Sequence, residues 1–160
     1  PFEVAKDPRV GASDAELREA YTLAKRAHDL LTRAHDAVLH LCDVRTQAET
    51  WAGRAPSLKE AARALAEKLS AVEAELITVK SDDPRMFPSR LNTRLATVVT
   101  LVEYSDAPPT AALRDLTDNL ALRTEMELAK LEQIVASDVA AFNAACRDAG
   151  LGAIVPKAGG

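Results

Sequence analysis

Apolar residues recur at alternating steps of three and four positions through the first third of the chain, a spacing that keeps them on one face of an α-helix. The positions are Leu17, Ala20, Ala24, Ala27, Leu31, Ala34, Val38, Leu41, Arg45 (the one polar member) and Ala48. Ser13 with Glu16 matches the capping-box pattern that starts helices, and Pro56 prevents continuation. We predict a first helix from about Ser13 to Trp51, about 58 Å long at 1.5 Å per residue.

A second apolar stripe predicts a shorter helix over about residues 57–79. Its members are Leu58, Ala62, Leu65, Leu69, Val72, Leu76 and Val79. Ser57 with Glu60 repeats the capping-box pattern. Pro84 and Pro88 then prevent the second helix from continuing, and Pro88 suits the first turn of a third helix.

The third helix is predicted over about residues 88–104, and the fourth over about residues 110–149. The fourth carries a long apolar stripe and is followed by Gly150, a residue typical of the position after a helix. The stripe comprises Leu113, Leu116, Leu120, Thr124, Leu128, Leu131, Val135, Val139, Phe142 and Cys146. The lengths along the chain are therefore long, short, short, long.

Short connections make consecutive helices antiparallel neighbours. We therefore predict an all-α, antiparallel up-down four-helix bundle with two long outer helices and two short ones. The short helices cannot cover the far parts of the long ones, roughly 17–30 and 131–146, which would project as a two-helix arm. Apolar residues on that arm form a candidate interface with another protein surface: Leu17, Tyr21, Ile134, Val135 and Phe142.

Three segments follow from this pattern. Phe2 and Val4 alternate with polar neighbours, so residues 1–12 are interpreted as the last strand of an upstream β domain and a linker. Residues 13–150 form the bundle, and residues 151–160 form a flexible tail. On this interpretation the chain is part of a larger protein, and its partners are upstream domains of the same parent chain, a second copy in a homodimer, or both.

Composition narrows the function classes. The chain has 160 residues, 48% hydrophobic and only 4% aromatic, which favours helices over strands. The formal net charge is -4 and no basic block is present, so we expect no nucleic-acid partner. No apolar run approaches the roughly 20 residues needed to cross a bilayer, so we expect no membrane insertion.

The spacing of histidine and cysteine residues on the first helix could indicate either a metal site or a flank of the apolar seam. His28, His35 and Cys42 recur at intervals of seven, which puts them in one column on the first helix. Neighbours in this column would be about 10.5 Å apart, too far to share one ion, so the column is interpreted as a flank of the apolar seam rather than a metal site. His40 lies off the column and is expected to be solvated. We expect no metal and no cofactor.

The remaining candidates for chemistry also have plain structural alternatives. Cys42 and Cys146 are predicted about 35 Å apart, hence as two free and mostly buried thiols. The acidic pairs, Glu73 with Glu75 and Asp82 with Asp83, could be proposed as acid and base, but exposed helix faces and loops favour solvated carboxylates. Trp51 could be a sugar platform or a cap on the end of the bundle.

The most distinctive stretch is the loop between the second and third helices. Its two prolines could hold Met86 and Phe87 in fixed exposure as a recognition loop. Alternatively these side chains fold back as a plug under the helices while polar neighbours bind loop carbonyls. The candidate structural loop comprises Asp83, Pro84, Met86, Phe87, Pro88, Arg90 and Asn92.

These residues carry a family resemblance. The runs from Asp83-Pro84 to Phe87-Pro88, Arg90-Leu91-Asn92 with Leu95, Ser105 to Thr110, and Asp138 to Asn143 resemble the C-terminal helical region of large bacterial sortilin-like, BNR-repeat β-propeller proteins, often labelled glycosyl hydrolases. An immunoglobulin-like module precedes the helices there, and its last strand ends in a phrase similar to Pro1 to Val4 followed by Asp7 to Val10. The resemblance covers nearly the whole chain.

The resemblance implies an accessory domain. Any glycosidase-like activity of such a parent would belong to the propeller, so no catalytic residue transfers to this chain, and the parent would be exported, periplasmic or secreted. We therefore expect a non-catalytic C-terminal helical packing and assembly domain that acts through protein–protein interaction. The alternatives are a small-ligand-binding helical bundle and a homo-oligomerisation module of an unknown parent.

Overall fold

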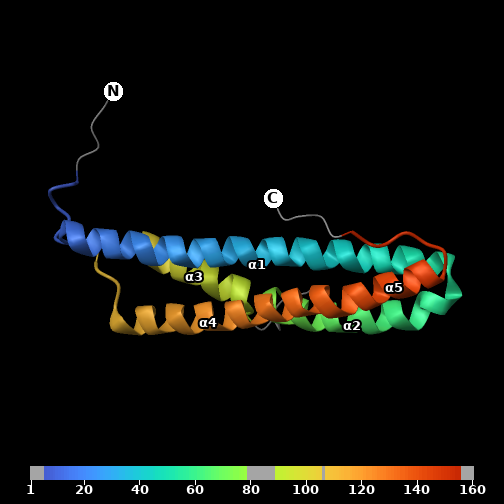
Figure 1. The fold of residues 1–160 in the computed structure, drawn as a ribbon. Coiled ribbons are helices and arrows are strands. Elements are labelled where there is room, and N and C mark those ends of the chain that lie inside the picture. The colour runs from blue at the N-terminus through green and yellow to red at the C-terminus, as the bar shows by residue number, and fades with distance from the viewer. Residues whose placement is uncertain (1–5, 79–88, 106, 156–160) are drawn as a thin grey trace, which may run out of the picture.

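The computed structural model describes residues 6–78, 89–105 and 107–155, and within these ranges the chain is all-helical (Figure 1). Two helical stretches are long and two are shorter, which confirms the predicted class of helical bundle. The elements are α1 (Asp14–Arg54), the 3₁₀ turn η1 (Pro56–Leu58), α2 (Lys59–Leu76), α3 (Leu91–Glu103), α4 (Ala111–Ile134), the π-helical segment η2 (Val135–Val139) and α5 (Ala140–Asp148). The predicted strand at Phe2–Val4 lies outside the described residues.

Helix α1 starts at the predicted capping box. The Glu16 amide donates to Ser13 Oγ over 3.3 Å, and the Ser13 amide donates to Glu16 Oε2 over 2.7 Å. Its buried face is rich in alanine, which lets neighbouring helices approach closely. The buried residues are Ala20, Ala27, Leu30, Ala34, Ala37, Leu41, Val44 and Ala48.

The long helices α1 and α4 run parallel to each other. Three ion pairs join them in increasing order along both: Glu19 with Arg114 at 2.5 Å, Arg26 with Asp118 at 2.5 Å, and Arg33 with Glu125. Such an order is possible only if both helices point the same way. The predicted alternation of directions therefore does not hold for α3 and α4.

The reason is the connection after α2. Helices α2 and α3 both run opposite to α1 and lie one after the other along it (Figure 1). The segment between them spans residues 77–90, which is longer than the two to eight residues typical of a tight turn between antiparallel helices. The chain can therefore continue in the same direction, and each level of the bundle contains α1, α4–α5 and either α2 or α3.

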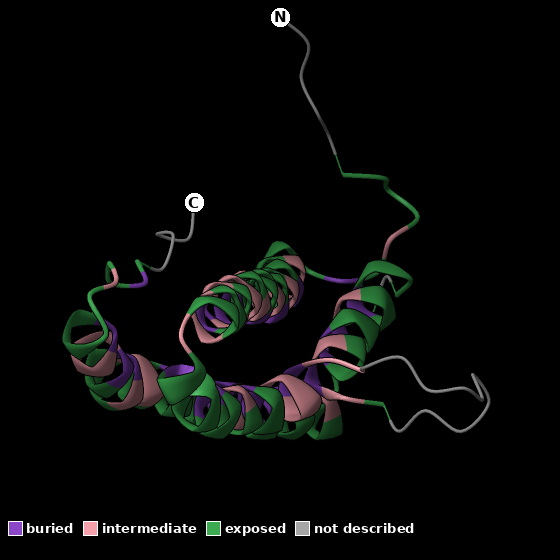
Figure 2. Cartoon of the chain, turned by 90° about the vertical axis from the view of Figure 1, so that its right-hand side faces the viewer, coloured by how far each residue is buried: buried purple, intermediate pink, exposed green. Residues whose placement is uncertain are grey.

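The projecting arm predicted from the sequence is wrong for the same reason. Because α1 and α4 are parallel, residues 17–30 and 131–146 lie at opposite ends of the bundle, and each is covered. Helix α3 packs on the first half of α1, whereas Val139, Phe142 and Cys146 are buried in the same core as α2. Figure 2 shows buried residues where the helices face one another and exposed ones on the outside.

Helix α2 begins differently from the prediction. Ser57 lies within the η1 turn, and the N-cap position of α2 is Leu58, which makes no side-chain cap hydrogen bond. Glu60 pairs instead with Arg63 at 2.6 Å. The expected capping box fails because the 3₁₀ turn moves the start of the α-helix past Ser57.

The tail after α5 folds back onto the bundle. Gly150 adopts a φ of 71°, which favours glycine, and the Leu151 amide then donates to the Cys146 carbonyl over 2.8 Å. Downstream, Asn143 binds both backbone groups of Ile154, at 2.7 and 3.1 Å. Gln47 of α1 binds both backbone groups of Val155, each at 3.0 Å. Residues 151–155 are therefore attached to α1 and α5 rather than free.

Candidate functional site

The five candidate interface residues do not form one surface. Tyr21 is 68% exposed near the start of α1, and Leu17 is partly buried nearby. Ile134 and Val135 lie partly buried at the junction of α4 and η2, and Phe142 is only 3% exposed in the core. The parallel arrangement of α1 and α4 separates Tyr21 from the other three. A contact through all five together is therefore impossible.

Most of the candidate loop lies outside the described residues. Asp83, Pro84, Met86, Phe87 and Pro88 belong to that segment, so neither the plug nor the recognition loop is decided. The two remaining members, Arg90 and Asn92, are described. Arg90 is the N-cap residue of α3, and its guanidinium pairs with Glu75 of α2 at 3.0 Å, which ties the start of α3 to the end of α2.

The acidic residues of α2 are held in interhelical ion pairs. Glu73 accepts from Arg45 of α1 at 2.6 Å, and both side chains are mostly buried. Glu75 pairs with Arg90 and lies 3.6 Å from Arg123 of α4. Each carboxylate thus has its own basic partner, an arrangement that stabilises helix packing and gives no pair of carboxylates with opposed roles. Asp82 and Asp83 lie outside the described residues.

Both cysteines are free thiols, as predicted. Burial raises the pKa of Cys42, and its Sγ lies 3.7 Å from Glu73 Oε1, whose negative charge raises that pKa further. Burial also raises the pKa of Cys146. Since the thiolate is the reactive form, these environments disfavour nucleophilic chemistry at either sulfur.

Trp51 lies near the end of α1, partly buried. The Arg54 guanidinium covers its ring at 4.6 Å from the centroid. The tail passes beside it, because a Cβ added at Gly152 would lie 4.0 Å from Trp51 Cζ2. The side chain therefore contacts the tail at the end of the bundle.

The histidines differ in environment. His28 and His35 are exposed on α1. Among the described residues no group of three or more metal-ligating side chains is close enough to hold an ion. His40, expected to be solvated, is instead partly buried, and its Nε2 atom is buried without a hydrogen-bond partner in the described part of the chain. That prediction is wrong because α4 packs beside this turn of α1.

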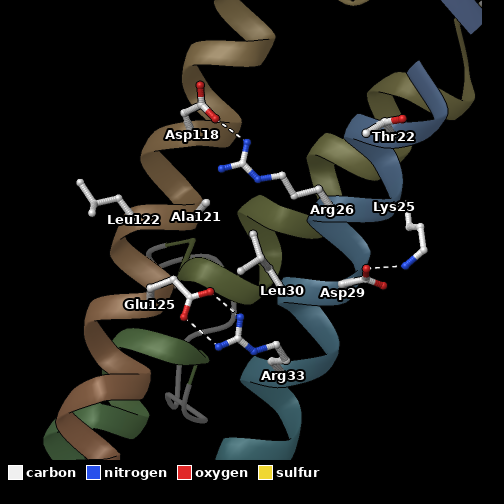
Figure 3. Close-up of a pocket in the computed structure, with 10 residues that line it drawn as sticks. All are labelled: Thr22, Lys25, Arg26, Asp29, Leu30, Arg33, Asp118, Ala121, Leu122 and Glu125. Carbon is white, nitrogen blue, oxygen red and sulfur yellow. Dashed lines mark hydrogen bonds and ion pairs between the residues drawn. The ribbon is translucent and has the colours of Figure 1, made fainter. Parts of the chain in front are cut away.

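A groove follows the parallel helices α1 and α4. Its upper part is a cavity of about 590 Å³ crossed by two ion pairs, Arg26 with Asp118 and Arg33 with Glu125 (Figure 3). The Arg33 guanidinium binds both carboxylate oxygens of Glu125, and this hydrogen bonding lowers the pKa of Glu125. Leu30 forms part of the floor.

The groove continues past Arg33 into a second cavity of about 400 Å³. No ion pair crosses it among the residues described. Its lining is mainly apolar, with two carboxylates, one imidazole and, where it meets the upper part, one guanidinium: Arg33, Asp36, Ala37 and His40 from α1, Leu128, Leu131 and Glu132 from α4, and Val135 and Ala136 from η2. π-helical segments in an α-helix often occur at functional sites. We call this the lower cavity.

A third concave surface lies where α3 ends and α4 begins. This cleft of about 370 Å³ is lined by Val102, Pro108, Pro109 and Leu113, with Leu101 and Leu116 at its edges. Leu101 is 51% exposed, and Tyr104, the residue that ends α3, is 89% exposed. We call it the α3–α4 corner. The sequence did not reveal this corner, because Leu116 falls in the apolar stripe of the fourth helix and Leu101 falls in no predicted stripe.

Comparison with known protein families, with curated proteins and with solved structures found no match. Within the described ranges, every helix is too short or too polar to span a membrane.

Proposed function

We propose that this bundle is a non-catalytic packing and assembly module that acts through protein–protein contact at the α3–α4 corner. The observation that carries the proposal is the pair of exposed leucines that line an apolar cleft, Leu101 and Leu116, with the exposed Tyr104 three residues after Leu101. Large exposed apolar side chains gathered in one place are typical of contact surfaces.

The position of the corner supports this use. The Glu19–Arg114 ion pair places the starts of α1 and α4 at the same end of the bundle, so the corner lies at the end where residues 6–13 enter. Ala12 is buried there. In a larger bacterial β-propeller protein of the kind the sequence resembles, a preceding domain would be joined at this end and could pack on the corner.

For the chain by itself, we propose that the occupant is a second copy. An isologous contact brings the same surface of each copy together, so that Leu101, Tyr104 and Leu116 would cover their counterparts. Light scattering coupled to size exclusion, over a concentration series of residues 1–160, should show a dimer at the higher concentrations.

The variants Leu101→Glu and Leu116→Glu should abolish the dimer while helix content by circular dichroism stays constant. Leu39→Glu is the matched control, because Leu39 is 70% exposed on α1 and lines none of the three concave surfaces. A monomer at all concentrations, or a dimer that survives both corner variants, would contradict self-association through the corner.

A further inference from the structure

The groove between α1 and α4 is built on a seven-residue register. Two ion pairs cross it, Arg26 with Asp118 and Arg33 with Glu125, and each joins residues 92 positions apart. In parallel helices that pack as a coiled coil, charged pairs beside the seam recur every seven residues, and the two members of each pair are separated by a constant number of positions. The next pair in this register is His40 with Glu132, which lies at the lower cavity. There, no ion pair between described residues joins the two helices.

A comparison of the two cavities shows what the lower one lacks. Shifting each upper residue by seven keeps two of the three carboxylates, since Asp29 becomes Asp36 and Glu125 becomes Glu132. The same shift removes two cations. Thr32 is the equivalent of Lys25, which pairs with Asp29 at 2.5 Å in the upper cavity. His40 is the equivalent of Arg33, which pairs with Glu125.

The shift also moves the apolar floor from one helix to the other. Ala37 occupies the position of Leu30 on α1, whereas Leu128 occupies the position of Ala121 on α4. The remaining floor, from Leu128, Leu131 and Val135, is apolar. The lower cavity therefore keeps two carboxylates and, of the basic side chains, only the Arg33 guanidinium that Glu125 already binds.

Three polar groups that line the lower cavity, those of Asp36, His40 and Glu132, lack an ion-pair partner within the described part of the chain. Neither Asp36 nor Glu132 forms an ion pair with a described residue. Arg33 is bound by Glu125, and the more distant charge of Glu132 makes only a small further contribution to the raised pKa of Arg33. His40 Nε2 is buried and unpartnered. A buried polar atom without a partner costs about 1–3 kcal/mol, and such atoms often indicate an absent water, ion or ligand.

We propose that the lower cavity binds a small organic cation, a primary ammonium or guanidinium group on an alkyl chain. The cationic group takes the place of the missing basic side chain between Asp36 and Glu132. The alkyl chain lies on Leu128, Leu131 and Val135. The unpartnered Nε2 atom of His40, whose side chain lines the cavity, is the hydrogen-bond acceptor for the cation. A volume of about 400 Å³ is within the usual range for small-molecule sites.

This site is distinct from the α3–α4 corner and does not depend on the proposed assembly function. The probe we would use is n-hexylammonium, titrated into residues 1–160 and followed by amide chemical shifts. We expect saturable shifts centred on Ala37, His40 and Ala136, at concentrations near 1 mM or below. Hexanoate, which has the same chain length and the opposite charge, should bind at least about tenfold more weakly, because the cavity already holds two carboxylates.

The decisive variant restores the missing basic groups in the chain itself. Thr32→Lys combined with His40→Arg supplies both cations at their register positions, so n-hexylammonium should bind at least about tenfold more weakly while helix content stays constant. His28→Arg is the control for His40→Arg, since it makes the same histidine-to-arginine change at an exposed position of α1 outside the cavity and should leave binding unchanged. Equal affinity for hexanoate, unchanged binding in the double variant, or no saturable shift at millimolar concentration would each overturn the proposal.

Discussion

The docked tail provides a local perturbation whose size can be worked out from the structure. Ile154 is 2% exposed, and its backbone is held by Asn143, while Gln47 holds the next residue. The substitution Ile154→Ala removes most of the apolar contact without altering the atoms that form these hydrogen bonds. In a rigid core, an isoleucine-to-alanine change costs about 2–5 kcal/mol.

The tail should not cost that much, because it can undock without unfolding the helices. Burial of the Ile154 side chain contributes about 1.5–3 kcal/mol, and the four hydrogen bonds from the Asn143 and Gln47 side chains to the tail backbone contribute about 0.5–1.5 kcal/mol each. Ordering residues 151–155 costs about 1–2 kcal/mol per residue. These terms nearly cancel. Docking is therefore worth a few kcal/mol at most, and Ile154→Ala should release the tail.

We expect Ile154→Ala to lower the free energy of unfolding by only about 1–2 kcal/mol, the limit set by the docking energy. The chain has one tryptophan, and Trp51 lies beside Gly152 of the tail. Its emission should therefore shift to longer wavelength in native buffer while the helical circular dichroism signal stays constant. Urea denaturation followed by both signals measures the two effects.

Val155→Ala is the control for this experiment. The Val155 side chain is 70% exposed, although its backbone is bound by Gln47 in the same way, so stability and Trp51 emission should change little. A loss above about 3 kcal/mol with Ile154→Ala would mean that the tail unfolds together with the core. An unchanged Trp51 emission would mean that the tail remains docked, and either result would refute the reasoning.

Three further predictions concern the helices. Leu95→Ala should cost about 2–5 kcal/mol in urea denaturation, because Leu95 is fully buried where α3 packs in the core, and a cost below 1 kcal/mol would contradict that packing. Glu73→Ala should cost about 1.5–3 kcal/mol by the same assay, because it leaves the mostly buried Arg45 guanidinium without its carboxylate, and Arg45→Met in the same background should recover part of the loss. Hydrogen bonding from Arg33 lowers the pKa of Glu125 in the folded state, so this pair stabilises the fold above the unfolded glutamate pKa of about 4.3, and the contribution is lost as the pH falls through the lower folded value. Both side chains are half exposed, so Glu125→Gln should lower the free energy of unfolding at pH 7 by less than about 1 kcal/mol, seen as a slightly lower melting temperature. The difference in melting temperature between the variant and the wild type should become smaller below about pH 4. A difference that grows in acid would contradict the stabilising role of the pair.

The helices themselves were predictable because their signals are local. Ser13 and Glu16 cap α1 as their spacing indicates, Thr110 caps α4 through the Leu113 amide at 3.2 Å, and Gly150 takes the positive φ expected after a helix. Each of these interactions joins residues a few positions apart. The pattern is therefore visible before any tertiary contact is known.

The candidate sites were less predictable. His40 was assigned to solvent because the helical face it shares with Arg26 and Arg33 becomes a groove only when α4 lies alongside. The signal was present in the sequence as two heptad series, Arg26, Arg33 and His40 on one helix and residues 118, 125 and 132 on the other, at the constant offset of 92. Recognising it requires knowing that these helices are parallel.

The sequence by itself determined the number, length and apolar faces of the helices, since capping, periodicity and proline act over one or two turns. Only the tertiary structure decided their directions. Residues 77–90 are long enough either to reverse the chain or to let it continue, and the choice depends on which arrangement buries the stripes of α3 and α4 against α1. That choice made α1 and α4 parallel. In the parallel arrangement Arg33 pairs with Glu125, whereas Glu132 shares a cavity with His40 and has neither arginine nor lysine at the corresponding position of α1.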